Sequence, residues 1–176
     1  QTLTVQAPGG IIRLSGFEFE GAFKASKAVT IEATFNVAAT SILKTFCTDC
    51  RLITGNPTPV GTQLPYYPKI KGTLSGTYQI PLTSDIDGFV RADYTYTGKI
   101  FDSESDTTWL APASRINLRL GVVRGNSSLE VYGTNITDNR TPTSLARNSD
   151  SLTGTNAISV SLADKATYGI RAKTKF

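Results

Sequence analysis

The stretch Tyr168-Gly-Ile-Arg-Ala-Lys-Thr-Lys-Phe176 decides the fold class. Successive side chains of an extended strand point to opposite faces of a sheet. One face of this stretch therefore carries aromatic and aliphatic residues, and the other carries an arginine and two lysines. Soluble domains more often end in a frayed polar tail. A barrel in lipid must instead pair its last strand with its first, because an open edge leaves backbone groups unsatisfied. The stretch favours a transmembrane β-barrel.

The same alternation recurs along most of the sequence. It predicts strands over residues 11–25, 29–37, 74–82, 90–96 and 116–122, a strand that begins at residue 129, a final strand over 158–176 and a short strand over 2–6. The longer of these runs could cross a bilayer, which takes about 9–11 residues of tilted strand. Strands of soluble sheets are usually about 5–6 residues long. We therefore expect an all-β, antiparallel meander of seven or eight strands.

The connections between these strands alternate in length. Short turns are expected near residues 26–28, 83–88 and 124–128, and long loops over 44–69, 102–112 and 138–156. In a meander, alternate connections lie at the same end of the sheet. One end would therefore carry tight turns and the other long loops, which is the asymmetry of bacterial outer-membrane barrels.

Composition excludes several other classes. The net charge of +4 is small and scattered, so a nucleic-acid surface is not expected. No run of about 18 apolar residues could form a transmembrane helix. The sequence contains no histidine, no Gly-x-Ser-x-Gly elbow and no evident catalytic carboxylate pair, so we expect neither an enzyme nor a bound cofactor.

Alternation alone does not say which face lies inside. A soluble barrel has its apolar face inside, whereas a wide membrane barrel has it outside, and both show the same alternation. Strand length and loop asymmetry favour the membrane. So do tyrosines near the predicted strand ends, which could form an interfacial girdle (Tyr66, Tyr67, Tyr94, Tyr96 and Tyr168).

Cys47 and Cys50 form a Cys-Thr-Asp-Cys motif. A metal knuckle or a redox pair would use this spacing. However, the sequence offers no histidine and no second cysteine pair, and no helical pattern follows the motif. We expect no metal here and favour a small disulfide that pins a loop in an oxidising compartment.

Several segments together resemble the carboxy-terminal part of a TonB-dependent outer-membrane receptor. Leu14-Ser-Gly-Phe-Glu-Phe-Glu20 and Arg91-Ala-Asp-Tyr-Thr-Tyr96 resemble strands of that family. Gln63-Leu-Pro-Tyr-Tyr-Pro-Lys69 resembles its passage from a long loop into a strand. Ile116-Asn-Leu-Arg-Leu-Gly121, Tyr132-Gly-Thr-Asn-Ile-Thr-Asp138 and the final strand follow in the family's order. The resemblance implies the last third of a barrel of about 22 strands.

The resemblance also implies a function and a set of partners. Residues 1–176 would be the carboxy-terminal portion of the barrel, with the plug domain and TonB box absent from this sequence. The whole receptor would lie in the outer membrane of a Gram-negative bacterium. It would take up a scarce or bulky nutrient, such as a ferric siderophore, a corrinoid or an oligosaccharide, with energy from TonB. Its partners would be outer-membrane lipid, its own plug and remaining strands, TonB, and the barrel-assembly machinery.

Candidate ligand-binding residues lie in the predicted loops: Arg51, Tyr66, Tyr67, Asp102, Glu104, Asp106, Trp109, Arg140 and Arg147. Trp109 could stack on a sugar or an aromatic ligand, although packing within a loop is the commoner role. Charged residues on the polar strand faces are expected to be solvated or to pair across strands. By resemblance, Tyr168, Gly169, Ile170 and Phe176 would form the signal for barrel assembly.

Two alternatives stay open from the sequence. One is a self-contained eight-stranded outer-membrane barrel with an adhesive or structural role, which would need a full strand at residues 1–7. The other is a soluble β-sandwich binding module with its apolar face buried.

Overall fold

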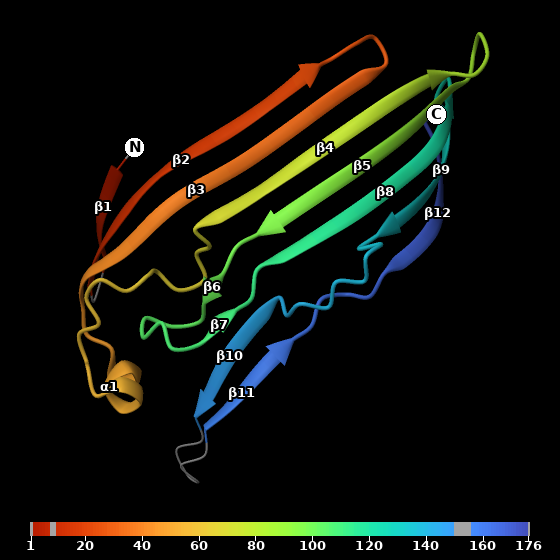
Figure 1. Cartoon of the computed structure of the whole chain (residues 1–176). Coiled ribbons are helices and arrows are strands. Elements are labelled where there is room, and N and C mark those ends of the chain that lie inside the picture. The colour runs from red at the N-terminus through yellow and green to blue at the C-terminus, as the bar shows by residue number, and fades with distance from the viewer. Residues whose placement is uncertain (1, 8–9, 150–155, 176) are drawn as a thin grey trace.

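The computed structural model describes residues 2–7, 10–149 and 156–175. One eight-stranded antiparallel sheet forms the body of the chain, in the order β1-β2-β3-β4-β5-β8-β9-β12 (Figure 1). Its strands are β1 (Thr2–Ala7), β2 (Gly10–Lys24), β3 (Val29–Thr45), β4 (Ile70–Pro81), β5 (Asp87–Thr97), β8 (Ala113–Arg124), β9 (Ser127–Thr134) and β12 (Thr167–Thr174). The order confirms the predicted meander.

The remaining elements belong to the long connections. They are the helix α1 (Thr48–Thr54) and two small hairpins, β6 (Ile100–Phe101) with β7 (Trp109–Leu110) and β10 (Ser144–Ser149) with β11 (Asn156–Ser161). All three connections lie at one end of the sheet, and the tight turns lie at the other (Figure 1). In the turn between β8 and β9, Gly125 has φ +51°, a conformation that a residue without Cβ adopts readily.

The two faces of the sheet differ in chemistry because the strands pair in register. On one face Leu74 lies opposite Ala33 and Tyr94. On the other, Ser75 lies opposite Glu32 and Asp93. The same division extends from β2 to β12, so the sheet has one apolar and one polar face.

The apolar face is exposed across its whole width. Leu74 in the middle of the sheet is 53% exposed, and Ile170 in β12 is 74% exposed. Phenylalanines of β2 and β3 also lie on this face and stack on one another, as Phe19 and Phe35 do at 5.2 Å between ring centroids. Among the described residues no second layer covers this face, which does not fit the soluble sandwich, whose apolar face would be buried.

Buried apolar side chains gather at the loop end instead. They are Ala38, Ile42, Cys50, Phe101, Leu110, Ala113, Leu145 and Ala163. Ile42, near the loop end of β3, is only 2% exposed. The described part of the chain therefore has its apolar core beneath the long loops rather than between layers of sheet.

β1 and β12 form the two edges of the sheet and do not pair with each other. The eight strands therefore make an open, curved wall, and the described residues do not form a closed eight-stranded barrel. No helix among the described residues is both long and apolar enough to span a membrane.

The structure corrects four expectations from the sequence. The strand predicted over 29–37 continues to Thr45, and α1 begins within the cysteine motif, at Thr48, where no helix was expected. The single final strand over 158–176 is wrong, because β11 and β12 are separate elements. The loop predicted over 138–156 also contains β10.

Candidate functional site

The first long loop folds back onto β3. Ile42 N–H donates to Thr62 O at 2.9 Å, and Gly61 N–H donates to Ile42 O at 2.8 Å. Leu64 N–H donates to the Thr40 hydroxyl at 2.9 Å. These bonds extend the pairing of β3 beyond β4 and bury Thr40 and Ile42. Residues 61–69 are consequently a fixed part of the wall's rim.

The three long loops are joined to one another by hydrogen bonds. Gln63 N–H donates to Asp106 Oδ2 at 3.0 Å, and Tyr66 N–H donates to Phe101 O at 2.9 Å. The Tyr66 hydroxyl donates to Leu145 O in β10 at 3.2 Å. We call residues 46–69, 98–112, 135–149 and 156–166 the loop cluster, because these hydrogen bonds join its three loops to one another.

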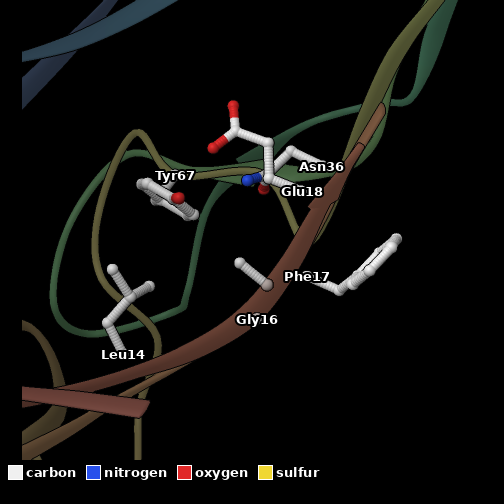
Figure 2. Close-up of a pocket in the computed structure, with 7 residues that line it drawn as sticks. Leu14, Gly16, Phe17, Glu18, Asn36 and Tyr67 are labelled. Carbon is white, nitrogen blue, oxygen red and sulfur yellow. The ribbon is translucent and has the colours of Figure 1, made fainter. Parts of the chain in front are cut away.

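A cavity of about 480 Å³ opens on the polar face of the sheet, beneath the first loop (Figure 2). It is lined by Leu14, Gly16, Phe17, Glu18, Asn36, Ala38 and Tyr67. Figure 2 shows Glu18 and Asn36 side by side, with Tyr67 facing them from the loop. Phe17 points to the opposite side of the strand in the same view. The cavity offers an aromatic ring, a carboxylate and an amide to a ligand.

A second cavity of about 320 Å³ lies between the first and second loops. Its lining includes Lys69, Lys99 and Tyr96. Lys99 Nζ lies 3.9 Å from the Trp109 ring centroid and 4.5 Å from that of Phe101. The two rings meet edge to face at 6.3 Å. Trp109 is thus packed within its own hairpin while 51% of it stays exposed, so a ligand can still reach it.

Burial raises the pKa of Asp106, although Gln63 N–H and the charges of Lys99 and Lys69 act in the opposite direction. Its other carboxylate oxygen, Oδ1, is buried and has no hydrogen-bond partner among the described residues. The ionised form of Asp106 is therefore less favourable in the fold than in the unfolded chain.

Asp106→Asn should strengthen the contact between the first two loops at pH 7. A carboxyl group with a raised folded pKa contributes most below its unfolded pKa of about 3.9, and this contribution is lost as the pH rises through the folded pKa. An asparagine still accepts from Gln63 N–H but carries no charge. We expect a higher protection factor for the Gln63 amide in the variant at pH 7, and the same factor in both proteins at pH 3.5. A variant that is less protected at pH 7 would contradict this reasoning.

Asn135 fastens the third loop. Its Nδ2 donates to Asp164 O at 2.8 Å and to Asn139 O at 3.1 Å, and its Oδ1 accepts from Asn139 N–H at 3.0 Å. Its own N–H donates to Asn117 Oδ1 at 2.9 Å. Asn135 and Asp138 both have positive φ, which asparagine and aspartate tolerate better than most residues. The Asn-Ile-Thr-Asp segment therefore closes the rim between β9 and β12.

A disulfide joins Cys47 to Cys50 in the first loop. Cys47 Sγ accepts from Cys50 N–H at 3.0 Å, and Cys47 N–H donates to Pro57 O at 2.8 Å. The Thr45 hydroxyl donates to Glu104 Oε2 at 3.0 Å, which ties this region to the second loop.

Charged residues on the polar face pair across strands. Arg91 pairs with Glu32 two strands away in β3 and with Asp93 in its own strand, and Arg119 in the neighbouring strand lies 3.1 Å from Asp93. Arg171 pairs with Glu130 in the neighbouring strand at 2.8 Å. Pairing of this kind matches the cross-strand arrangement expected from the sequence.

The structure divides the predicted ligand-binding residues into those that lie in the loop contacts and cavities and those that do not. Tyr66, Tyr67, Glu104, Asp106 and Trp109 lie in the contacts and cavities described above. Arg51 lies in α1, Asp102 is buried, and Arg140 lies 3.7 Å from Asp138. Arg147 belongs to β10. Sequence reasoning missed Asn36, Lys69 and Lys99, which lie on or beside strands and carry no local signal of a binding role.

The predicted assembly signal is partly described. Tyr168 and Ile170 lie on the exposed apolar face of β12, and Gly169 lies between them. Phe176 lies outside the described residues.

The sequence profile described as "TonB dependent receptor-like, beta-barrel" matches residues 1–161. The chain therefore belongs to the TonB-dependent receptor β-barrel family, whose members are outer-membrane receptors and transporters of Gram-negative bacteria rather than enzymes. A search of curated proteins finds no match.

Solved structures with the same fold include two receptors. The ferric yersiniabactin uptake receptor FyuA from Yersinia pestis is 18% identical, with a TM-score of 0.76 over 96% of this chain and 24% of the receptor. The siderophore receptor PiuA from Acinetobacter baumannii is 20% identical, with a TM-score of 0.70 over 93% of this chain and 22% of that one. This chain thus spans about a quarter of the length of these receptors.

Proposed function

We propose that this chain is the carboxy-terminal barrel portion of an outer-membrane transporter that imports a scarce, bulky nutrient with energy from TonB. The observation that supports this proposal is the structure of the wall, the open eight-stranded sheet. Its apolar face is exposed from β2 to β12, its opposite face is charged, and its long loops gather at one end. Lipid would cover the apolar face, and the plug domain and the remaining strands would complete the barrel.

Ferric siderophores are the substrate class that we favour over corrinoids and oligosaccharides. The similar solved receptors for ferric yersiniabactin and for a siderophore in Acinetobacter baumannii support this choice. The loop cluster offers suitable groups, because Trp109 and Tyr67 present aromatic surface and Lys69 and Lys99 line one cavity. Aromatic and cationic groups suit the planar, anionic chelating groups of a ferric complex.

TonB-dependent uptake of an iron-55-labelled siderophore by cells tests this proposal. Cells that carry the full-length receptor should accumulate the label, and cells without TonB should not. In the purified receptor, Tyr67→Ala or Trp109→Ala should raise the ligand Kd about tenfold, equivalent to about 1.4 kcal/mol. Lys27→Ala, in a turn at the far end of the sheet, is the matched control and should leave the Kd unchanged. Equal uptake with and without TonB would refute the proposal.

We further propose that β12 carries the signal read by the barrel-assembly machinery. The exposed apolar row of Tyr168 and Ile170 supports this role. Deleting Phe176 from the full-length receptor should reduce the amount of heat-modifiable barrel in the outer membrane. Unchanged assembly would refute the role.

A further inference from the structure

We propose that the first two loops form a binding site for a thiophilic divalent cation, such as Zn²⁺ or Cd²⁺, when the Cys47–Cys50 disulfide is reduced. The site would consist of the two cysteine thiolates and the Glu104 carboxylate. This inference is independent of the transported nutrient and of TonB.

The geometry that supports the site is the position of Glu104. One ligand atom each from Cys47, Cys50 and Glu104 lie within 4.8 Å of one another, although Glu104 belongs to a different loop. The sequence motif alone offered only two ligands. Folding therefore supplies a third, and water can fill the fourth position of a tetrahedral ion.

The ligands are held in place by contacts that do not involve a metal. The Thr45 hydroxyl donates to Glu104 Oε2, which leaves Oε1 free of that bond. Cys50 N–H donates to Cys47 Sγ, and a bond of this kind stabilises a thiolate. Once the disulfide opens, two sulfurs bound to one Zn²⁺ would lie about 3.8 Å apart, given Zn–S bonds of about 2.3 Å in a tetrahedron. A small local separation of the two side chains is enough to reach this distance.

The redox step needs two equivalents of a small-molecule thiol. Cys50 is 1% exposed whereas Cys47 is half-buried, so an incoming thiolate would attack Cys47 Sγ and release the Cys50 thiolate. A second thiolate then attacks the outer sulfur of the mixed disulfide, which releases the Cys47 thiolate and a small-molecule disulfide. The two thiols supply both electrons. The cation then takes the place of the protons that the two cysteine thiols would hold.

Soft thiolates together with one carboxylate favour Zn²⁺ and Cd²⁺ over Mg²⁺ and Ca²⁺, which prefer oxygen ligands. The bound ion would join the first loop to the second directly. Reduction would thus exchange a link within one loop for a link between two loops.

Cadmium titration of the purified full-length receptor tests the site. The receptor is reduced with a dithiol, desalted under anaerobic conditions and titrated with Cd²⁺ alone, and the thiolate-to-cadmium ultraviolet band is recorded. We expect one equivalent of Cd²⁺ to bind after reduction and no such band before it. The double variant Cys47→Ser/Cys50→Ser should lose the band.

Glu104→Gln separates the proposed site from a simple dithiol. The glutamine still accepts from Thr45 but is a poor ligand, so Cd²⁺ affinity should fall at least about tenfold. Asp49→Asn is the matched control, because Asp49 lies between the cysteines in sequence but outside the cluster, and it should leave the affinity unchanged. Heat modifiability on a gel shows that each variant is folded. The proposal is overturned if the folded, reduced receptor shows no band, or if Glu104→Gln binds as tightly as the unsubstituted receptor.

Discussion

Leu74→Arg should destabilise the assembled receptor by about 2–4 kcal/mol. Leu74 lies on the apolar face in the middle of the wall, opposite Ala33 and Tyr94, and is 53% exposed. A guanidinium placed there would enter the hydrocarbon of the bilayer, where such substitutions cost this amount near the midplane. Reversible unfolding of the full-length receptor in lipid vesicles with guanidinium chloride would measure the change.

Thr73→Arg is the matched control, one residue away on the polar face. Its side chain lines a cavity that also contains Glu20 and Glu32, so an arginine there remains near water and carboxylates. We expect this variant to change the free energy of unfolding by less than about 1 kcal/mol. Equal losses in the two variants would mean that the apolar face does not contact lipid.

Asn135→Ala should detach the third loop from the rim at a cost of about 2–4 kcal/mol. The asparagine is 5% exposed, and its side chain makes three hydrogen bonds to the backbone of Asn139 and Asp164. Truncation removes these bonds and leaves buried polar groups without partners. Hydrogen exchange at the Asn139 amide should accelerate about 30-fold or more, which corresponds to about 2 kcal/mol.

Asn135→Gly distinguishes the stability lost with the hydrogen bonds from the stability lost through backbone strain. Asn135 has φ +48°, which glycine adopts without the cost that alanine incurs. The glycine variant should therefore lose the three bonds but be less destabilised than the alanine variant. Asn56→Ala is the control, because Asn56 is an exposed loop residue that caps Thr58 N–H, and its effect should be about 0.5 kcal/mol or less. Unchanged exchange at Asn139 in both Asn135 variants would show that the network does not hold the loop.

Period-two alternation predicted the wall well because each strand has one apolar and one polar face. The prediction failed where the alternation continued but the strand no longer paired with the strands of the wall. Residues 158–162 alternate like a strand of the wall, yet β9 ends at Thr134, where it meets Thr167 of β12. The preceding residues have no wall strand beside them, so β11 pairs with β10 instead. Asn135 then holds Asp164 O in the break between β11 and β12.

The candidate site was predictable in residue type but not in arrangement. Loops rich in tyrosine, tryptophan and charge indicated a binding surface, and five of the nine predicted residues take part in its contacts or cavities. Glu104 contacts Thr45 and also lies close to the two cysteines, although these residues are far from it in sequence. Such contacts arise from the meander's geometry, which brings alternate connections to one end, and no local pattern encodes them.

The position of the apolar core has a consequence for recognition of the receptor from outside the cell. Ile42, Phe101 and Leu110 exclude water beneath the loops, whereas the wall below them relies on its surroundings to cover its apolar face. If the loop cluster faces outward, as the proposed function implies, we expect this buried core to keep the shape of the outer surface when detergent replaces lipid. An antibody or a phage that binds this surface would then meet a conformational epitope built from three separate loops, and we expect short linear peptides from any one loop to reproduce it poorly.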